Sequence, residues 1–181
     1  MFRALAIVEL NSIAKGMEIA DIMIKTSYVE VLTIKHICPG KFMIILNGDV
    51  EELNEAVKVI VDLGGKSLIG SYVIPNIHEE IVRALSKRVI CNSYDAIGIM
   101  EVSSVTMGIV SLDKALKSGA VKLVKLVLGN GIGGKSYYVV TGSVSSVEEA
   151  LKSAENVIEG KKLINKVIIP SPSEQLLKSV F

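Results

Sequence analysis

The sequence of 181 residues is poor in several residue types, and each shortage excludes a class of function. Tryptophan is absent and only 4% of the residues are aromatic, so we expect neither an aromatic binding cleft nor a sheet on which RNA bases stack. Two cysteines are too few for the disulfide framework of a small secreted domain. The formal net charge of +1 provides no basic surface for nucleic acid or anionic lipid. No apolar run approaches the ~20 residues of a membrane span.

The chain contains an internal sequence repeat. The run ALAIVELNS at residues 4–12 returns as AIGIMEVSS at residues 96–104, an offset of 92. Offsets of 92 to 95 relate further pairs, namely Gly16 and Gly108, Asp21 and Asp113, Lys25 and Lys117, Gly40 and Gly134, Lys41 and Lys135, Pro75 and Pro170, and Glu79 and Glu174. Two copies of about 90 residues are each long enough to fold, which predicts domains at 1–90 and 92–181.

The chain is also rich in aliphatic residues. Half of the residues are hydrophobic and the mean hydropathy is +0.49. Two small cores cannot hide all of this surface, so we expect part of it to be buried between subunits. We expect a cytoplasmic protein with no nucleic-acid partner and no membrane partner.

Both copies predict the same order of elements, β-α-β-β-α-β-α. Copy one predicts strands over 3–9, 29–37, 42–46 and 68–74, and helices over 13–26, from 47–49 to 64–65, and over 77–85. Copy two predicts strands over 96–102, 121–128, 137–141 and 163–169, and helices over 112–118, 147–158 and 174–180. The expected class is α/β (α+β), with two ferredoxin-like domains, each a four-stranded antiparallel sheet with helices on one side.

One segment matches a nucleotide-binding pattern. Residues 129–136 satisfy G-x-x-x-x-G-K-S, but phosphate binding requires a helix directly after the loop. The Tyr-Tyr-Val-Val run at 137–140 predicts a strand instead. A nucleotide-dependent enzyme is therefore a minor alternative, and Gly131, Gly133 and Gly134 indicate a tight hairpin where backbones from several subunits crowd together.

Cys38 is the residue with the most interesting context. It lies in the predicted turn at 38–41 (Cys-Pro-Gly-Lys), and the corresponding loop of copy two has no cysteine. Lys35, His36 and Lys41 are near in sequence and would favour a thiolate. One thiolate cannot hold a cluster or a structural zinc ion. In a ring of three chains, however, three thiolates would suit an iron–sulfur cluster with an open fourth position or a three-cysteine zinc site.

The other chemically capable residues favour structural roles. Cys91 has no partner motif, and His36 and His78 lack metal-ligand spacing to each other. Glu9 and Glu101 are equivalent in the two copies, which indicates architecture rather than an acid–base pair. No nucleophile–base arrangement is visible, so we do not expect an enzyme.

Several of these features together resemble a known family. The opening strand with Glu9, the helix with Gly16 and Asp21, the Gly-Asp-Val run at 48–50 and the strand ending at Pro75 are similar to the bacterial microcompartment (BMC) shell domain. Two such domains in non-permuted order resemble the tandem-domain shell proteins. Within that group, residues 12–18, 37–42 and 131–135 resemble the iron–sulfur-binding type of propanediol-utilisation compartments.

The resemblance implies a specific assembly and cofactor. Such chains form homotrimers that mimic a hexamer and tile with other shell proteins around enzymes. In this type, Cys38 from each subunit, within the turn that includes Pro39 and Gly40, would line the central opening. Three copies would bind one [4Fe-4S] cluster per trimer for electron transfer across the shell, and an encapsulated redox enzyme would be a partner. Nearby backbone amides and lysines would stabilise the negative charge of the cluster.

The resemblance also concerns the edges of the tile. Lys25 and Lys117 match the shell-edge lysine of the family, whereas the residues after Pro75 and Pro170 depart from its usual Arg and His. Two alternatives stay open. A metabolite-conducting tile predicts the same trimer without a cluster, and a ligand-sensing regulatory protein with paired ferredoxin-like domains predicts a small-molecule site and no iron.

Overall fold

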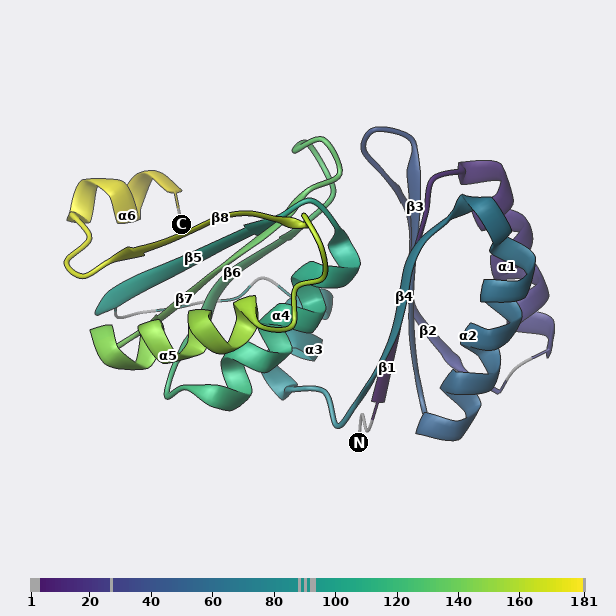
Figure 1. Ribbon diagram of the computed structural model, residues 1–181, viewed down its shortest axis with the longest axis horizontal. Helices are drawn as coiled ribbons and strands as arrows, with labels where there is room; N and C mark the ends of the chain where they lie inside the picture. Colours follow the sequence, from purple (N-terminus) through teal and green to yellow (C-terminus); the bar gives the residue numbers. More distant parts are fainter. Residues whose placement is uncertain (1–3, 27, 88, 90, 92–93, 181) are drawn as a thin grey trace. The chain divides into compact units, whose positions relative to one another are not determined.

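The computed structural model describes residues 4–26, 28–87, 89, 91 and 94–180 (Figure 1). The expected start of the first strand at Arg3 lies outside the described residues. So do the expected domain ends at Met1, Ile90, Asn92 and Phe181.

The element order is that of a doubled β-α-β-β-α-β-α unit. The elements are β1 (Ala4–Leu10), α1 (Ile13–Thr26), β2 (Glu30–Ile37), β3 (Lys41–Gly48), α2 (Val50–Gly64), the 3-10 helix η1 (Gly65–Ser67), β4 (Leu68–Pro75), α3 (Glu79–Ser86), β5 (Ala96–Val102), α4 (Val105–Ser118), β6 (Lys122–Leu128), β7 (Ser136–Gly142), α5 (Val144–Glu155), β8 (Leu163–Ile169) and α6 (Glu174–Val180). The sheets have the orders β2-β3-β1-β4 and β6-β7-β5-β8, and all neighbouring strands are antiparallel. The expected fold class is confirmed.

The two sheets repeat even in their irregularities. The pairing of β1 with β4 shifts register between Glu9 and Leu10, and that of β5 with β8 shifts between Glu101 and Val102. The outer pairs, β2 with β3 and β6 with β7, also shift at equivalent points. Irregularities of this kind are specific features of a fold. Positions related by the repeat can therefore be compared residue by residue.

Capping side chains decide where several helices begin. α1 begins at Ile13, as expected. α4 begins at Val105, and the expected start at Leu112 is wrong, because the Ser104 hydroxyl accepts a hydrogen bond from the Met107 N–H at 3.4 Å and caps an earlier turn. α5 begins at Val144, three residues earlier than expected, because Ser143 caps it, and it ends at Glu155, also three residues earlier.

The described chain forms two compact units. The first runs up to Ile77 and includes the loop 129–134, and the second contains the rest of the chain from His78. α1 and α2 cover one face of the first sheet, and α4 and α5 cover one face of the second (Figure 1). α3 packs in the second unit, beside α4 and β6.

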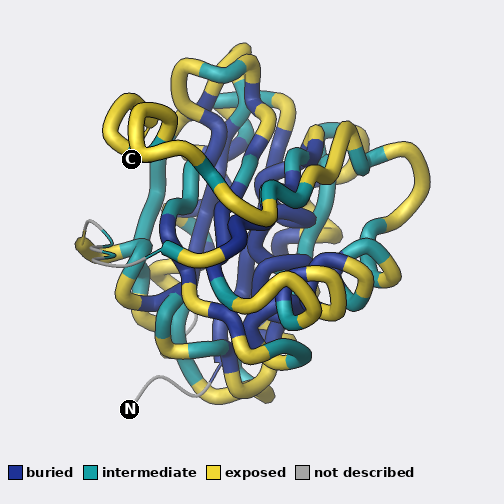
Figure 2. Tube along the Cα trace, turned by 90° about the vertical axis from the view of Figure 1, so that its left-hand side faces the viewer, coloured by how far each residue is buried: buried dark blue, intermediate teal, exposed yellow. Residues whose placement is uncertain are grey.

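The core of the first unit lies between its sheet and its two helices. Alternate residues of β1 belong to it, together with residues of β3, α1 and α2. Figure 2 colours the buried segments dark blue. The fully buried members include Ala4, Ala6, Val8, Leu10, Met23, Ile44, Leu46, Leu53, Ala56 and Ile60. None of the described helices is long and apolar enough to cross a membrane.

Candidate cysteine site

Cys38 lies in the tight turn between β2 and β3 and is exposed. Pro39 follows it through a cis peptide bond. The Gly40 N–H donates to the Ile37 carbonyl at 3.1 Å and closes the turn. Gly40 has φ +94°, a backbone conformation that glycine adopts readily and other residues do not. The sequence of the turn therefore holds one thiol at the tip of a short hairpin.

Glycines of the second copy pack closely on this turn. The loop 129–134 belongs to the same compact unit, and the Cys38 N–H donates to the Gly129 carbonyl at 3.2 Å. A Cβ on Gly134 would lie 2.2 Å from the Cys38 carbonyl oxygen, whereas a Cβ on Gly131 or Gly133 would have no neighbour within 4 Å. Within the chain, close approaches to this turn occur at Gly129 and Gly134. The expected crowding of backbones from several subunits stays a prediction.

A repeated ion pair lies beside the segment that connects the two strands of each hairpin. Lys41 donates to the Glu9 carboxylate at 2.9 Å, and Lys135 donates to Glu101 at 3.0 Å. Glu9 is fully buried, so its partner compensates a charge that water does not reach. Sequence reasoning identified both glutamates as architectural but did not pair them with the lysines. The signal was available, because both members of the pair recur in the second copy.

The polar groups of the turn have partners within the chain. The Lys41 ammonium is paired with Glu9, and the N–H groups of Cys38 and Gly40 donate to carbonyl oxygens. Lys35 and His36 lie on β2, shortly before the turn. The expectation that backbone amides and lysines near Cys38 stabilise a cluster stays a prediction.

The two ion pairs predict different effects of the same substitution. Lys41→Met keeps the aliphatic stem but leaves the buried Glu9 carboxylate without its cation, and we expect it to lower the free energy of unfolding by about 2 kcal/mol. Lys135→Met is the matched control at the equivalent, half-exposed pair, with an expected loss of about 0.5 kcal/mol. Urea unfolding of both variants measures the difference, and equal losses would contradict the structural role assigned to the Glu9 pair.

The comparisons with known proteins identify the family. The BMC domain family matches residues 4–77 and 96–172, which together make up most of the sequence. The chain belongs to the BMC-domain family. It is 41% identical over 181 residues to the bacterial microcompartment shell protein PduT of Citrobacter freundii, with 99% of this chain and 98% of the relative covered.

Solved structures extend the likeness of this BMC protein to three dimensions. A crystal structure of a microcompartment protein from Desulfitobacterium hafniense DCB is 36% identical, with a TM-score of 0.85 and coverage of 98% of this chain and 99% of that one. A fused permuted hexameric shell protein from the RMM microcompartment, 18% identical, shares the fold with a TM-score of 0.67 and coverage of 87% and 88%. The resemblance to tandem-domain shell proteins is confirmed. The chain is a structural shell protein of a bacterial microcompartment.

The phosphate-loop pattern does not have the structure that nucleotide binding needs. Ser136, the last residue of the pattern, begins strand β7, and the expected strand after the loop is confirmed. No helix start is available at this point to hold phosphate groups.

The remaining candidate ligands of this BMC protein do not form a metal site within one chain. Cys91 packs against the buried residues Ile97, Val124 and Val139, as a structural cysteine does. Among the described residues of a single chain, no three His, Cys, Asp or Glu side chains gather in a way that could hold a metal ion.

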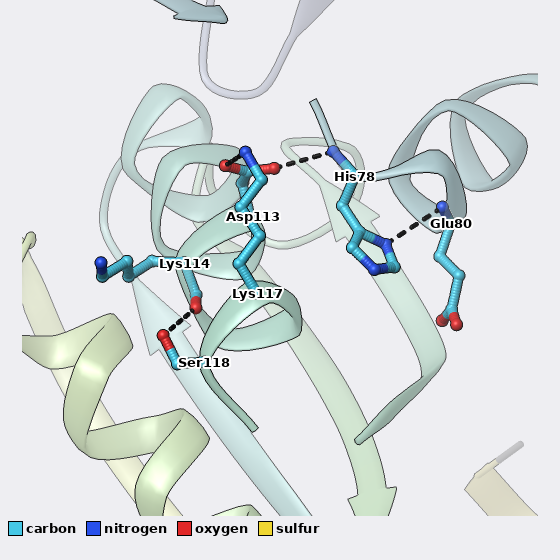
Figure 3. Close-up of polar contacts among 6 residues, drawn as sticks. All are labelled: His78, Glu80, Asp113, Lys114, Lys117 and Ser118. Carbon is cyan, nitrogen blue, oxygen red and sulfur yellow. Dashed lines mark hydrogen bonds and ion pairs between the residues drawn. The ribbon is translucent and has the colours of Figure 1, made fainter. Parts of the chain in front are cut away.

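The two lysines at the expected shell edge have equivalent surroundings. Lys25 pairs with Asp21 and Lys117 pairs with Asp113, each at 2.6 Å and one helical turn apart. In the second BMC domain the aspartate has an additional partner, because the His78 N–H donates to Asp113 Oδ1 at 2.8 Å (Figure 3). The sequence favoured a structural role for His78, and the structure places it at the N-cap of α3.

Proposed function

We propose that this BMC protein assembles as a homotrimer in a microcompartment shell, with Cys38 of three chains holding one [4Fe-4S] cluster on the threefold axis. The observation that carries the proposal is the exposed thiol, present once per chain, at the tip of the β2–β3 turn. Each chain has two equivalent sheets, so three chains present six similar units around a ring. Such a pseudohexamer fits among hexameric shell tiles.

The Cys38 turn suits a ligand shared between chains. Cysteine thiolates are the usual ligands of iron–sulfur clusters, and an exposed sulfur can reach a group that a buried sulfur cannot. The hydrogen bond that closes the turn at Gly40 and the packing of Gly129 and Gly134 restrict the backbone that carries the sulfur. The bound cluster would supply one-electron transfer across the shell. Each chain would contribute one ligand, Cys38, so the trimer would position the cluster and supply three of its four ligands.

The proposed tile has two further kinds of partner. Lys25 and Lys117, each beside its aspartate, would meet other shell proteins at the edges of the trimer. An encapsulated redox enzyme would exchange electrons with the cluster. The compartment as a whole is cytoplasmic in this proposal.

Anaerobic purification tests the proposal directly. We expect a native mass of three chains, four irons and four sulfides per trimer, and a brown protein with visible absorption that bleaches on oxidation. A colourless trimer without iron would contradict the cluster and would favour the metabolite-conducting tile. A stable monomer or dimer would contradict the ring itself.

A further inference from the structure

Helix α3 covers a specific surface in the second unit. The His78 N–H that precedes the helix donates to Asp113 on α4 (Figure 3), and the Glu80 carboxylate accepts from the Leu123 N–H at 2.6 Å. Leu123 is on β6, the terminal strand of its sheet, so Glu80 satisfies an edge N–H that no strand pairs. Ile81 of α3 is fully buried. The covered surface, called here the α4/β6 surface, thus consists of one face of α4 and the outer edge of β6.

The first unit has the equivalent of this surface, but its apolar residues are open. Met17 and Ile24 on α1 are 58% and 53% exposed. Their equivalents on α4, Ile109 and Leu116, are 0% and 6% exposed. Both pairs lie on the helix face that carries the repeated aspartate, at spacings of four and three residues from it. The equivalent helix faces therefore differ: that of α4 in the second unit is buried, and that of α1 in the first unit is exposed to solvent.

The polar groups of the surface show the same contrast. The side chain of Asp21 is 61% exposed and that of Asp113 is 9% exposed, although both pair with a lysine at the same distance. The equivalent of Leu123 is Val31, on β2, and β2 is likewise a terminal strand. The α1/β2 surface, defined by Met17, Asp21, Ile24 and the outer edge of β2, thus offers the groups that α3 binds on the α4/β6 surface.

The chain also has a second copy of the covering helix. By the repeat, α6 corresponds to α3, with Ser173 in the place of His78, Gln175 in that of Glu80 and Leu176 in that of Ile81. None of the residues of α6, all of which are described, is buried, and Figure 2 shows this segment as exposed. It contacts its own unit through Lys125, whose ammonium donates to the Val180 carbonyl at 2.5 Å. One chain therefore holds a bare surface and the helix that fits it.

We infer that α6 of one chain docks on the α1/β2 surface of a second copy, as α3 docks on the α4/β6 surface. In this arrangement the Ser173 N–H donates to the Asp21 carboxylate, and the Gln175 side-chain carbonyl accepts from the Val31 N–H. Leu176 is buried against α1. The two contacting surfaces differ, so each chain uses both and the contact repeats head to tail around a ring. The inference rests on the proposed trimer and names the segment that joins its subunits.

A designed disulfide tests the contact. In a chain with Cys38→Ser and Cys91→Ser, the pair Asp21→Cys and Ser173→Cys should link neighbouring chains on mild oxidation. We expect covalent dimers and trimers on denaturing gels that revert to monomers on reduction. Either substitution alone should leave the chains monomeric on the same gel.

The chain provides its own matched control. His78→Cys with Asp113→Cys, in the same background, places the equivalent pair within one chain, so oxidation should consume both thiols while the protein stays a monomer on denaturing gels. If this control links and the Asp21 and Ser173 pair does not, the inference is overturned. An intrachain link in the latter pair would overturn it as well, because α6 would then cover its own chain.

Native mass separates this inference from the proposed function. If the native mass is that of three chains but the cysteines at positions 21 and 173 do not link, the proposed trimer is supported and α6 is not part of its interface. A covalent ladder beyond three chains supports the docking of α6 but contradicts a closed ring of three. A native mass of one chain, with no disulfide between chains, would overturn both the docking of α6 and the proposed trimer.

A second variant keeps the test independent of disulfide chemistry. Leu176→Glu places a charge where the inference buries an apolar side chain, and we expect at least a tenfold weaker association in sedimentation at a series of concentrations. Lys178→Glu is the matched control, because its equivalent Arg83 is largely exposed on α3, and it should leave the association unchanged. If both variants self-associated as strongly as the unmodified chain does, this result would contradict the docking of α6.

Discussion

Replacing Cys38 with serine is expected to remove all of the iron of the proposed cluster while leaving the proposed trimer intact. One substitution in the gene would remove every cysteine ligand at once, because in the proposed site each chain contributes the same residue. A serine hydroxyl is not ionised at neutral pH and is a poor ligand for iron in place of a thiolate. The side chain is exposed in a turn, so the fold loses no core packing. Iron and sulfide analysis, visible absorption and native mass of the anaerobic protein measure the effect.

Cys91→Ser is the matched control for this prediction. Cys91 packs against a small apolar cluster, and its substitution should lower stability by about 1 kcal/mol without loss of iron. A Cys38→Ser protein that stayed brown, with unchanged iron, would show that this sulfur is not a ligand. If only the Cys91 variant lost iron, Cys91 and not Cys38 would be the cluster ligand.

Much of the fold was predictable because the chain repeats. The two copies predict the same order of elements independently, and β5, β8 and α6 have the predicted bounds. The start of α4 was missed because the β-branched residues Val105, Thr106 and Val110 disfavour a helix when propensity alone is considered. Comparison of Ser104 with Ser12, which also caps its helix, would have found it.

The candidate site was less predictable, because its contacts join distant parts of the chain. The position of Cys38 in a turn follows from the adjacent proline and glycine, which is local information. The pairing of Lys41 with Glu9 and the packing of Gly134 on the turn depend on the tertiary structure. The sequence near Cys38 did not reveal that Lys41 pairs with Glu9, because proximity in sequence does not say which partner a charged side chain has.

The repeat also explains where the two copies differ in function. Equivalent positions keep the architecture, as the Glu9 and Glu101 pairs show, whereas the hairpin tips diverge into a cysteine turn and a glycine loop. In the described chain these two different tips contact each other. The loop without the cysteine therefore supports the turn that has it, and this division of roles is open only to a chain with two copies of the unit.

Replacing Gly134 with alanine should disrupt this support and is expected to have a large effect on stability. The new methyl group would lie 2.2 Å from the Cys38 carbonyl oxygen, a backbone atom that cannot move without shifting the turn. Gly134 also has φ +76°, which costs a non-glycine residue about 1 kcal/mol. Adding about 2 kcal/mol for the overlap, we expect the free energy of unfolding to fall by about 3 kcal/mol. Because the overlap displaces Cys38, we also expect fewer irons per trimer.

Gly133→Ala separates the two causes, because the neighbouring glycine has nearly the same backbone conformation and nothing near its Cβ position. With φ +64° and no atom within 4 Å, alanine at Gly133 should lower the free energy of unfolding by only about 1 kcal/mol and leave the iron content unchanged. Urea unfolding and iron analysis of both variants give the comparison. If the two variants lost stability equally and both kept their iron, the close approach of the loop to Cys38 would contribute nothing to the site. A larger loss at Gly134, together with lost iron, would show that the glycine loop positions the thiol.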